Sequence, residues 1–287
     1  MTSPEKVYSG SISLADSTSW CISAYDKNAI EIVSYLRKIM GLHHPSNKHN
    51  KQLIVFTNSN TSIKKNLMPP LFEKQFPGHL PETRFCAVDN FTNMNMLALQ
   101  LMKIASIMRQ ESEKKMGFLI HGALAEHEGN GVILAGPGGI GKTTISNLLP
   151  EAWNSLCDDA TLIVRNQEGS YMAHPWPTWS KFMFGDSGGT WNVSKNFPVA
   201  GVYFLKRGNV EKSSEIKREE AICRLVRSAE EALIPIASRD DEYDSNDMRI
   251  NRFNNICAFS EFIPSYTLSF TQNGTFWKEI EKDISRN

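Results

Sequence analysis

A glycine-rich loop carries the strongest chemical signal in the sequence. Residues 136–143 read GPGGIGKT and match the pattern G-x-x-x-x-G-K-[ST] in full. Glycines let successive backbone N–H groups turn toward one anion, because no Cβ blocks the approach. Lys142 adds a mobile positive charge for the β and γ phosphates, and Thr143 supplies a hydroxyl for Mg²⁺. The motif predicts a site for a nucleoside triphosphate and magnesium.

The predicted phosphate site consists of this loop and the threonine after it. Its residues are Gly136, Pro137, Gly138, Gly139, Ile140, Gly141, Lys142, Thr143 and Thr144. The preceding run 132–135 is apolar and typical of a buried strand, and residues 144–149 have apolar side chains at helical spacing up to Pro150. Strand, glycine loop and helix form the context that the motif requires, with the positive end of the helix toward the phosphates.

Two adjacent carboxylates follow the loop. Phosphoryl transfer needs carboxylates to hold the metal and, in a kinase, a base for the attacking hydroxyl. Asp158 and Asp159 precede the apolar run 162–164, near the start of a strand that we expect over 157–164. In an ordinary P-loop ATPase the metal-binding aspartate ends an apolar strand, so this order indicates a different subclass. The alternative is that the pair only begins a turn.

The order of these motifs resembles that of a kinase family. An HG pair at 121–122, a hairpin, the glycine loop, a short helix and the Asp158-Asp159 pair follow one another. Residues 117–287 thereby resemble the C-terminal catalytic domain of HPr kinase/phosphorylase, which has a phosphoenolpyruvate carboxykinase-like P-loop fold. In layout the whole chain is more similar to stand-alone relatives found beside peptide-modification genes, such as lasso-peptide kinases and SynChlorMet cassette protein C.

The resemblance implies a role for several residues. Asp159 would be the base that deprotonates an acceptor hydroxyl, and Asp158 would hold Mg²⁺ together with Thr143. His121 would reach the transferred phosphoryl from a neighbouring strand, although a histidine in an apolar strand is as readily a buried core residue. The bifunctional relatives carry a glutamate directly after the loop hydroxyl, where this chain has Thr144. That difference predicts a one-way kinase with a substrate other than HPr.

The pattern of elements predicts an α/β protein. We expect a P-loop domain over residues 116–287, with a mixed sheet and flanking helices as in the HPr kinase C-terminal domain. A smaller α/β module over residues 1–115 would precede it and is a candidate for acceptor binding. The expected strands are 20–24, 53–57, 118–128, 132–135, 157–164, 171–174, 199–205 and 266–270, and the expected helices are 27–40, 94–108, 144–149, 218–233, 250–262 and 276–284.

Four further segments remain, two of which are open to more than one interpretation. Residues 58–84 look like a loop, and 129–131 read as the turn of a hairpin. The histidines at 43, 44 and 49 fit a surface loop better than a metal site, because no cysteine or carboxylate lies near them in sequence. Residues 174–191, rich in tryptophan, proline and glycine, are either an acceptor-binding loop with His174 on the acceptor side or a structural flap.

Composition narrows the range of partners and locations. The chain has 31 basic and 31 acidic residues, so nothing in its composition suggests a basic surface for nucleic acid or for an anionic membrane. No run of about 18 apolar residues suggests a membrane span, and the polar start lacks the apolar core of a signal peptide. The five widely spaced cysteines are expected to be reduced. We therefore expect a cytoplasmic protein.

These observations favour a Mg²⁺- and ATP-dependent kinase that acts on a Ser or Thr hydroxyl of a peptide or small protein, in a peptide-modification pathway. One alternative is a small-molecule kinase that phosphorylates free serine or a similar metabolite. Another is a nucleotide-binding switch or scaffold without transfer activity. The sequence leaves open which hydroxyl acceptor is used, whether ATP or GTP is the donor, and whether the chain forms a homo-oligomer.

Overall fold

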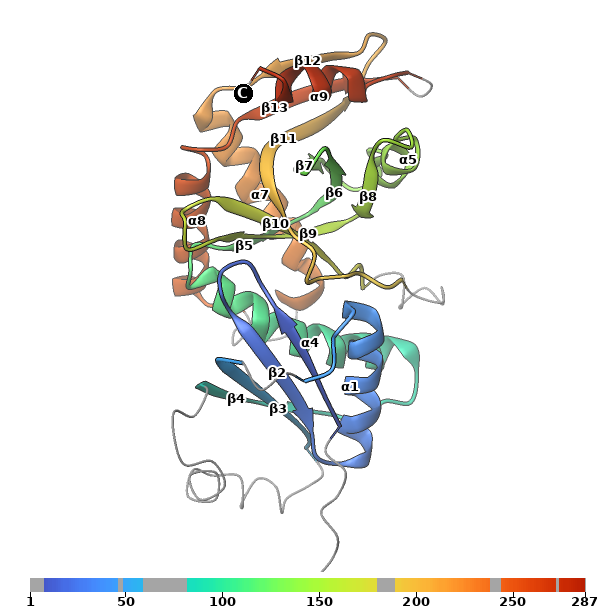
Figure 1. The fold of residues 1–287 in the computed structure, drawn as a ribbon, viewed down its shortest axis with the longest axis vertical. Coiled ribbons are helices and arrows are strands. Elements are labelled where there is room, and N and C mark those ends of the chain that lie inside the picture. Colours follow the sequence, from blue (N-terminus) through green and yellow to red (C-terminus); the bar gives the residue numbers. More distant parts are fainter. Residues whose placement is uncertain are drawn as a thin grey trace, which may run out of the picture. The chain divides into compact units, whose positions relative to one another are not determined.

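The computed structural model describes residues 8–45, 49–58, 82–179, 189–237, 244–271 and 274–286 of the chain. The chain divides into two compact units. Unit 1 consists of residues 1–108 and 179–194, and unit 2 of residues 109–178 and 195–287. Each unit combines helices with strands, which confirms the α/β class (Figure 1).

Unit 1 is built on a four-stranded sheet with the order β1-β2-β3-β4. The strands are β1 (Tyr8–Ser13), β2 (Ser19–Ala24), β3 (Lys51–Thr57) and β4 (Glu82–Val88). β1 runs antiparallel to β2, whereas β2, β3 and β4 are parallel. Helix α1 (Lys27–Met40) connects β2 to β3 and packs on the sheet, as its apolar spacing predicts. Asp26 caps its first turn by accepting a hydrogen bond from the Ala29 N–H, at 2.9 Å.

Helix α4 (Met94–Glu113) begins in unit 1 and ends in unit 2. It extends five residues beyond the helix predicted over 94–108. Its interior is apolar along most of its length, with Leu97, Leu101 and Ile104 fully buried. The helix is therefore a core element, as expected for its spacing of apolar side chains.

Unit 2 is built on one mixed sheet, which confirms the predicted sheet type. Its strands are β5 (Phe118–Ile120), β6 (Gly122–His127), β7 (Asn130–Ala135), β8 (Asn154–Cys157), β9 (Ala160–Arg165), β10 (Tyr171–Trp176), β11 (Phe197–Arg207), β12 (Lys212–Glu215) and β13 (Ser265–Phe270). The order is β5-β9-β10-β11-β7-β6-β8, with β13 beside β11 and β12 beside β13. β7, β11 and β13 are parallel, and the other pairs are antiparallel.

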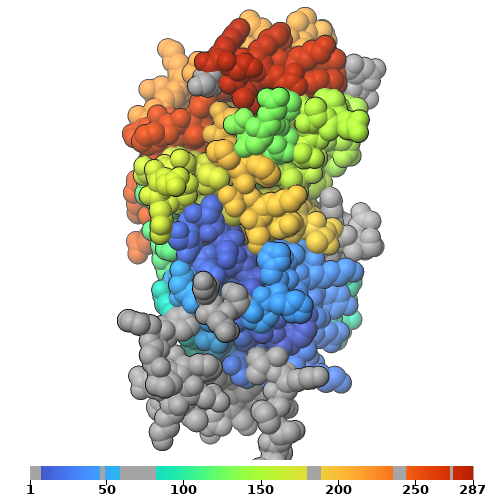
Figure 2. Space-filling view, in the orientation of Figure 1, coloured from blue at the N-terminus to red at the C-terminus, as the bar shows by residue number. Residues whose placement is uncertain are grey.

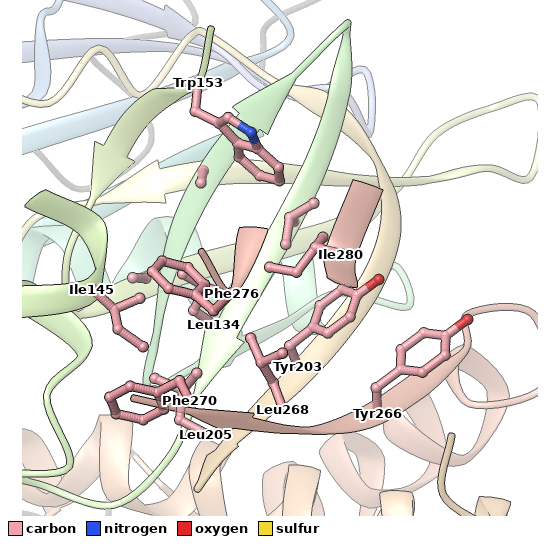
Figure 3. Close-up of a cluster of buried hydrophobic side chains, with 13 residues drawn as sticks. Leu134, Ile145, Trp153, Tyr203, Leu205, Tyr266, Leu268, Phe270, Phe276 and Ile280 are labelled. Atoms are coloured by element: carbon pink, nitrogen blue, oxygen red, sulfur yellow. The ribbon is translucent and has the colours of Figure 1, made fainter. Parts of the chain in front are cut away.

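The helices of unit 2 are α5 (Lys142–Asn147), α7 (Arg218–Ala237), α8 (Asn246–Phe259) and α9 (Trp277–Ile284). A core cluster joins α5 and α9 to strands β6, β7, β11 and β13 (Figure 3). Its members include Leu134, Leu268 and Ile280, all fully buried. This core fixes the end of β7, from which the glycine loop emerges. No helix among the described residues is both long enough and apolar enough to cross a membrane.

Helix α9 is held to the hairpin side of unit 2 by polar and aromatic contacts. The indole Nε1 of Trp153 donates a hydrogen bond to Glu281 at 3.0 Å, and the ring of Trp153 stacks on His127 with centroids 4.5 Å apart. In the space-filling view the red C-terminal segment accordingly meets the green part of the chain (Figure 2). These contacts close one end of the core.

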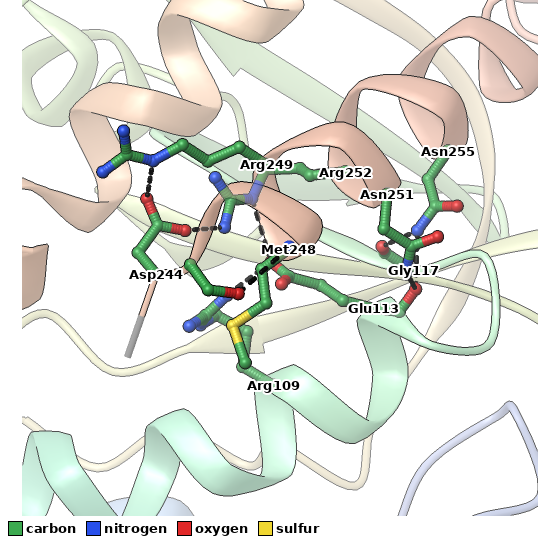
Figure 4. Close-up of polar contacts among 10 residues, drawn as sticks. Arg109, Glu113, Gly117, Asp244, Met248, Arg249, Asn251, Arg252 and Asn255 are labelled. Atoms are coloured by element: carbon green, nitrogen blue, oxygen red, sulfur yellow. Dashed lines mark hydrogen bonds and ion pairs between the residues drawn. The ribbon is translucent and has the colours of Figure 1, made fainter. Parts of the chain in front are cut away.

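A buried charged cluster ties helix α8 to the end of α4 (Figure 4). Glu113 forms ion pairs with Arg109 and Arg252, and Arg252 also pairs with Asp244. The amide of Asn255 donates to the Glu113 carbonyl at 2.7 Å and to the Gly117 carbonyl at 2.9 Å. Because buried charges are tolerated only when they are paired, these partners lock α8 beside the start of β5.

The structure corrects two predicted strands. The strand predicted over 118–128 is interrupted at His121, because β5 pairs with β9 whereas β6 pairs with β7 and β8. The strand predicted over 157–164 is likewise interrupted at the two aspartates, where β8 leaves β6 and β9 joins β5 and β10. Both breaks occur where the chain changes the strand to which it is hydrogen-bonded. The apolar pattern of a single segment does not reveal such a change of partner.

Turn and helix boundaries also differ from the prediction. The hairpin turn predicted at 129–131 lies at Glu128 and Gly129, whose φ angles of 48° and 80° fit a two-residue turn, and Asn130 already pairs with His127. Helix 250–262 is observed as α8 and helix 144–149 as α5, and each begins and ends earlier than predicted. The loop predicted over 58–84 ends where β4 begins at Glu82, and residues 59–81 lie outside the described residues.

Candidate active site

Strand pairing brings three segments to one edge of the unit 2 sheet. Gly122 at the start of β6 pairs with Ala135 at the end of β7. Strand β8 ends at Cys157 beside the same part of β6. Since His121 precedes β6, the glycine loop follows β7 and Asp158 follows β8, all three segments meet at this edge.

The glycine loop has a backbone that few other sequences could adopt. Gly139 and Gly141 have φ angles of 75° and 116°, in the region that disfavours side chains. A Cβ added at Gly139 would meet nothing within 4 Å, so the loop leaves space beside its backbone. The Lys142 ammonium donates hydrogen bonds to the carbonyls of Gly136, at 2.8 Å, and Pro137, at 3.4 Å. Lys142 thus contacts the backbone of the loop in which it is predicted to bind phosphate.

Burial changes the acid–base behaviour of the loop lysine. Lys142 is 6% exposed, and desolvation of its ammonium lowers its pKa. The negative charges of Asp159, Glu231 and Asp158 oppose this shift. These three carboxylates therefore face the lysine closely enough to favour its charged form.

Asp158 faces the loop hydroxyl. Thr143 Oγ1 donates to Asp158 Oδ2 at 3.4 Å, and Thr178 Oγ1 donates to the other carboxylate oxygen at 3.2 Å. A hydroxyl and a carboxylate are hard oxygen ligands of the kind that Mg²⁺ prefers, with water and phosphate oxygens completing its octahedral shell. The donor set of Thr143 and Asp158 therefore fits magnesium.

Asp159 lies beside the imidazole of His121. Its Oδ1 is 2.8 Å from Nε2 of the ring, and the carboxylate is 40% exposed. Nε2 is nevertheless shielded from solvent and makes no hydrogen bond of regular geometry with the residues that the structure describes. The contact is a close approach of the two groups rather than an aligned hydrogen bond. Asp159 thus combines an exposed carboxylate with a polar neighbour.

An open cleft of 580 Å³ adjoins the outer side of the loop. Its lining includes Ile140, Thr144, Leu148, Arg207, Asn209 and Phe270. The Arg207 guanidinium donates to the carbonyls of Gly139, at 3.2 Å, and Ile140, at 3.3 Å, and so braces the loop. Arg207 ends β11, which runs parallel to β7, so the sheet itself carries this side chain to the loop. The cleft has the size and mixed polarity of a small-molecule site.

The structure gathers the predicted site residues at this edge. All nine loop positions, together with Asp158, Asp159 and His121, lie within the segments just described. Their chemical roles stay predictions. His174 does not join them: it is fully buried in β10, inside the sheet, and has no surface to offer an acceptor.

Other predicted segments lie elsewhere. Residues 180–188 of the stretch 174–191 are outside the described residues, and Trp191 belongs to unit 1, where its N–H donates to the Ile39 carbonyl at 2.7 Å. Among the described residues, no group of three or more His, Cys, Asp or Glu side chains is arranged to hold a metal.

Sequence reasoning missed three residues of the site. Thr178 orients Asp158, Arg207 braces the loop, and Glu231 approaches His121 with its carboxylate 3.6 Å from Nδ1. Each comes from a segment distant in sequence from the loop. A signal was available only for Arg207. It closes a strand that runs parallel to β7, so that both strands end at the same edge of the sheet.

Comparisons with known proteins support a family assignment. The family model of SynChlorMet cassette protein ScmC matches residues 84–285. A solved structure titled "Structure of the Hpr(Ser) kinase/phosphatase from Coxiella burnetii" is similar at 10% sequence identity, covering 58% of this chain and 88% of that chain, with a TM-score of 0.32. A search of curated proteins gave no match. Because the family model spans well over half of its length, the chain belongs to the SynChlorMet cassette protein ScmC family.

Proposed function

We propose that this protein is a Mg²⁺- and ATP-dependent kinase that phosphorylates a Ser or Thr hydroxyl of a peptide or small protein. The observation that carries the proposal is the meeting of three groups of residues at one sheet edge. They are the glycine loop with Lys142, the pair Thr143 and Asp158 at 3.4 Å as candidate metal ligands, and the exposed carboxylate of Asp159.

Each residue has a distinct task in the proposed transfer. The loop N–H groups and Lys142 bind and orient the β and γ phosphates, which places the γ-phosphoryl for in-line attack. Thr143 and Asp158 hold Mg²⁺, which neutralises charge on the phosphate oxygens when bound. Asp159 accepts the proton of the acceptor hydroxyl as its oxygen attacks phosphorus. Lys142 stabilises the charge that the leaving diphosphate gains.

The cleft beside the loop supports a nucleoside triphosphate as donor. It adjoins Gly141 and Thr144 on the loop and offers the apolar side chains of Leu148 and Phe270 to a flat ring. Unit 1 is a candidate for binding the acceptor, as the module over residues 1–115 was predicted to be. The five cysteines of the chain form no disulfide bond, which together with the use of ATP supports a cytoplasmic location.

Ligand-dependent thermal melts test nucleotide binding at this site. Wild-type protein should gain stability from MgATP, by about 2.7 kcal/mol at a concentration 100 times Kd. Lys142→Ala should keep its fold and lose most of that gain, because it removes the charge that contacts phosphate. Lys282→Ala is the matched control, since Lys282 is an exposed lysine of α9 that pairs only with Glu279 among the contacts described for it. Equal gains in wild type and Lys142→Ala would contradict the proposal.

Transfer itself separates the kinase from its alternatives. Radiolabel from [γ-³²P]ATP should appear on Ser- or Thr-containing peptides. Label on free serine instead would identify the small-molecule kinase. Binding of MgATP without transfer to any peptide or small hydroxyl acceptor would favour the nucleotide switch.

A further inference from the structure

Helix α7 forms hydrogen bonds with both backbone polar groups of His121. The His121 N–H donates to the Ser228 carbonyl at 3.1 Å, and the Ser228 hydroxyl donates to the His121 carbonyl at 2.9 Å. These bonds fill the gap in the sheet ladder between β5 and β6. They satisfy backbone groups that a strand neighbour would otherwise pair. The position of His121 is therefore set by α7 as well as by the sheet.

The same helix also reaches the imidazole ring. Glu231 lies one turn after Ser228, and its Oε2 is 3.6 Å from His121 Nδ1, while Asp159 Oδ1 is 2.8 Å from Nε2. At 3.6 Å the Glu231 contact is electrostatic rather than a hydrogen bond. The ring is 18% exposed and Glu231 is 23% exposed, so solvent screens the pair only in part. The imidazole is thus flanked by a carboxylate at each nitrogen.

Glu231 is itself held and oriented. Its second oxygen, Oε1, accepts from Nε of Arg227 at 3.2 Å, one turn earlier in α7. Its charge also acts on Lys142, together with those of Asp158 and Asp159. Glu231 therefore faces the centre of the site, although it lies far from the loop in sequence.

We propose that Glu231 is a positioning residue, which fixes the imidazole of His121 against Asp159, the proposed base. The inference rests on the proposed kinase function. Asp159 alone would leave the ring free to rotate about its single close contact. A carboxylate at Nδ1 sets the direction of Nε2, in the way that a second partner commonly orients a functional histidine. The ring then holds the carboxylate of Asp159 in place, with Nε2 2.8 Å from Oδ1.

The test measures how tightly each variant binds MgADP with and without aluminium fluoride, which mimics the phosphoryl group in flight. The variants are Glu231→Gln, His121→Asn and the double variant. Glu230→Gln is the matched control, because Glu230 is the adjacent carboxylate of α7 and lines a different cleft, between α7 and α8. The measurement requires no acceptor, so it does not depend on the acceptor's identity.

In wild type, aluminium fluoride should tighten MgADP binding. Glu231→Gln should reduce that tightening by on the order of 10-fold and leave the affinity for MgADP alone within a few fold. The double variant should lose no more than His121→Asn, because Glu231 acts through the ring. The NMR resonance of His121 Nδ1 should move in Glu231→Gln and stay in place in Glu230→Gln.

Three outcomes would overturn the inference. They are unchanged tightening in Glu231→Gln, an effect of equal size in Glu230→Gln, and a Glu231→Gln effect that persists in full when His121 is already asparagine. Failure of the kinase proposal looks different: wild type would then bind MgADP no more tightly with aluminium fluoride than without it, or would not bind MgADP at all, and the inference would fall with it.

Discussion

Oγ1 of Thr143 and Oδ2 of Asp158 face one another at 3.4 Å. The first residue comes from the glycine loop and helix α5, and the second from the link between β8 and β9. Strand β6, which pairs with both β7 and β8, sets their separation. Two oxygen groups that we propose as magnesium ligands are thus brought together by the sheet.

Removing one of these ligands should weaken the response to metal. We expect Asp158→Asn to raise the Mg²⁺ concentration needed for nucleotide binding by about 10-fold or more, because an amide oxygen is a weaker ligand than a carboxylate. Titration of Mg²⁺ at fixed ATP, followed by thermal shift, measures this change. Asp247→Asn, in the first turn of α8, serves as a control and should behave as wild type. An unchanged Mg²⁺ requirement in Asp158→Asn would assign the metal to other ligands.

The lowered pKa of Lys142 predicts that affinity for the nucleotide falls at alkaline pH. Desolvation lowers this pKa, so in the free protein the ammonium loses its proton below the usual value of about 10.4. Phosphates bind the charged form. Affinity for MgATP should therefore be complete below the lowered pKa and decline as pH rises through it. Calorimetric titrations between about pH 7 and pH 10 measure the decline, and a flat profile would show that the lysine charge is not used.

The buried ion pairs of Asp244 predict a loss of stability in acid. Burial alone would raise its pKa, but hydrogen bonds and charge from Arg252, and then from Arg249, bring that pKa below its ordinary value. The folded pKa is thus lower than the unfolded one. The stabilisation is present above the unfolded pKa of about 3.9 and disappears as pH falls through the folded pKa.

Asp244→Asn should accordingly lower the free energy of unfolding at pH 7 by about 1.5 to 3 kcal/mol and flatten the acid limb of the stability profile. Urea unfolding at several pH values measures both effects. Glu261→Gln is the control, because Glu261 pairs with Arg218 on the surface with both side chains about half exposed. A surface pair of this kind contributes less than about 1 kcal/mol. Identical profiles for the two variants would contradict the role given to the buried cluster.

Much of the fold follows from local sequence. The bounds of α1 match the prediction of 27–40 because apolar spacing, the cap Asp26 and the terminal Gly41 agree with one another. β13 and α9 were predicted to within a residue from the spacing of their apolar side chains. Strands β1, β4 and β12 were not predicted, since they are short or mixed in polarity and owe their structure to pairing with neighbours.

The candidate site likewise contains residues that the sequence predicts and residues that it does not. Its loop was predictable because glycine, lysine and threonine at fixed spacing match the pattern of a phosphate-binding loop. Thr178 and Glu231 were not, because their contacts depend on the course of β10 and on the rotation of α7, which sequence periodicity alone does not determine. Contacts between segments far apart in the chain arise from strand register and helix packing.

The central claim is that Asp159 acts as the base for phosphoryl transfer, and single-turnover transfer from [γ-³²P]ATP tests it most directly. Asp159→Asn keeps the shape of the side chain and removes its basicity. We predict that the variant binds MgATP as wild type does and transfers phosphoryl at least about 100-fold more slowly, since a positioned base contributes about 10² to 10⁴ in rate. Transfer that survives within a few fold of wild type would contradict the account and place the base elsewhere.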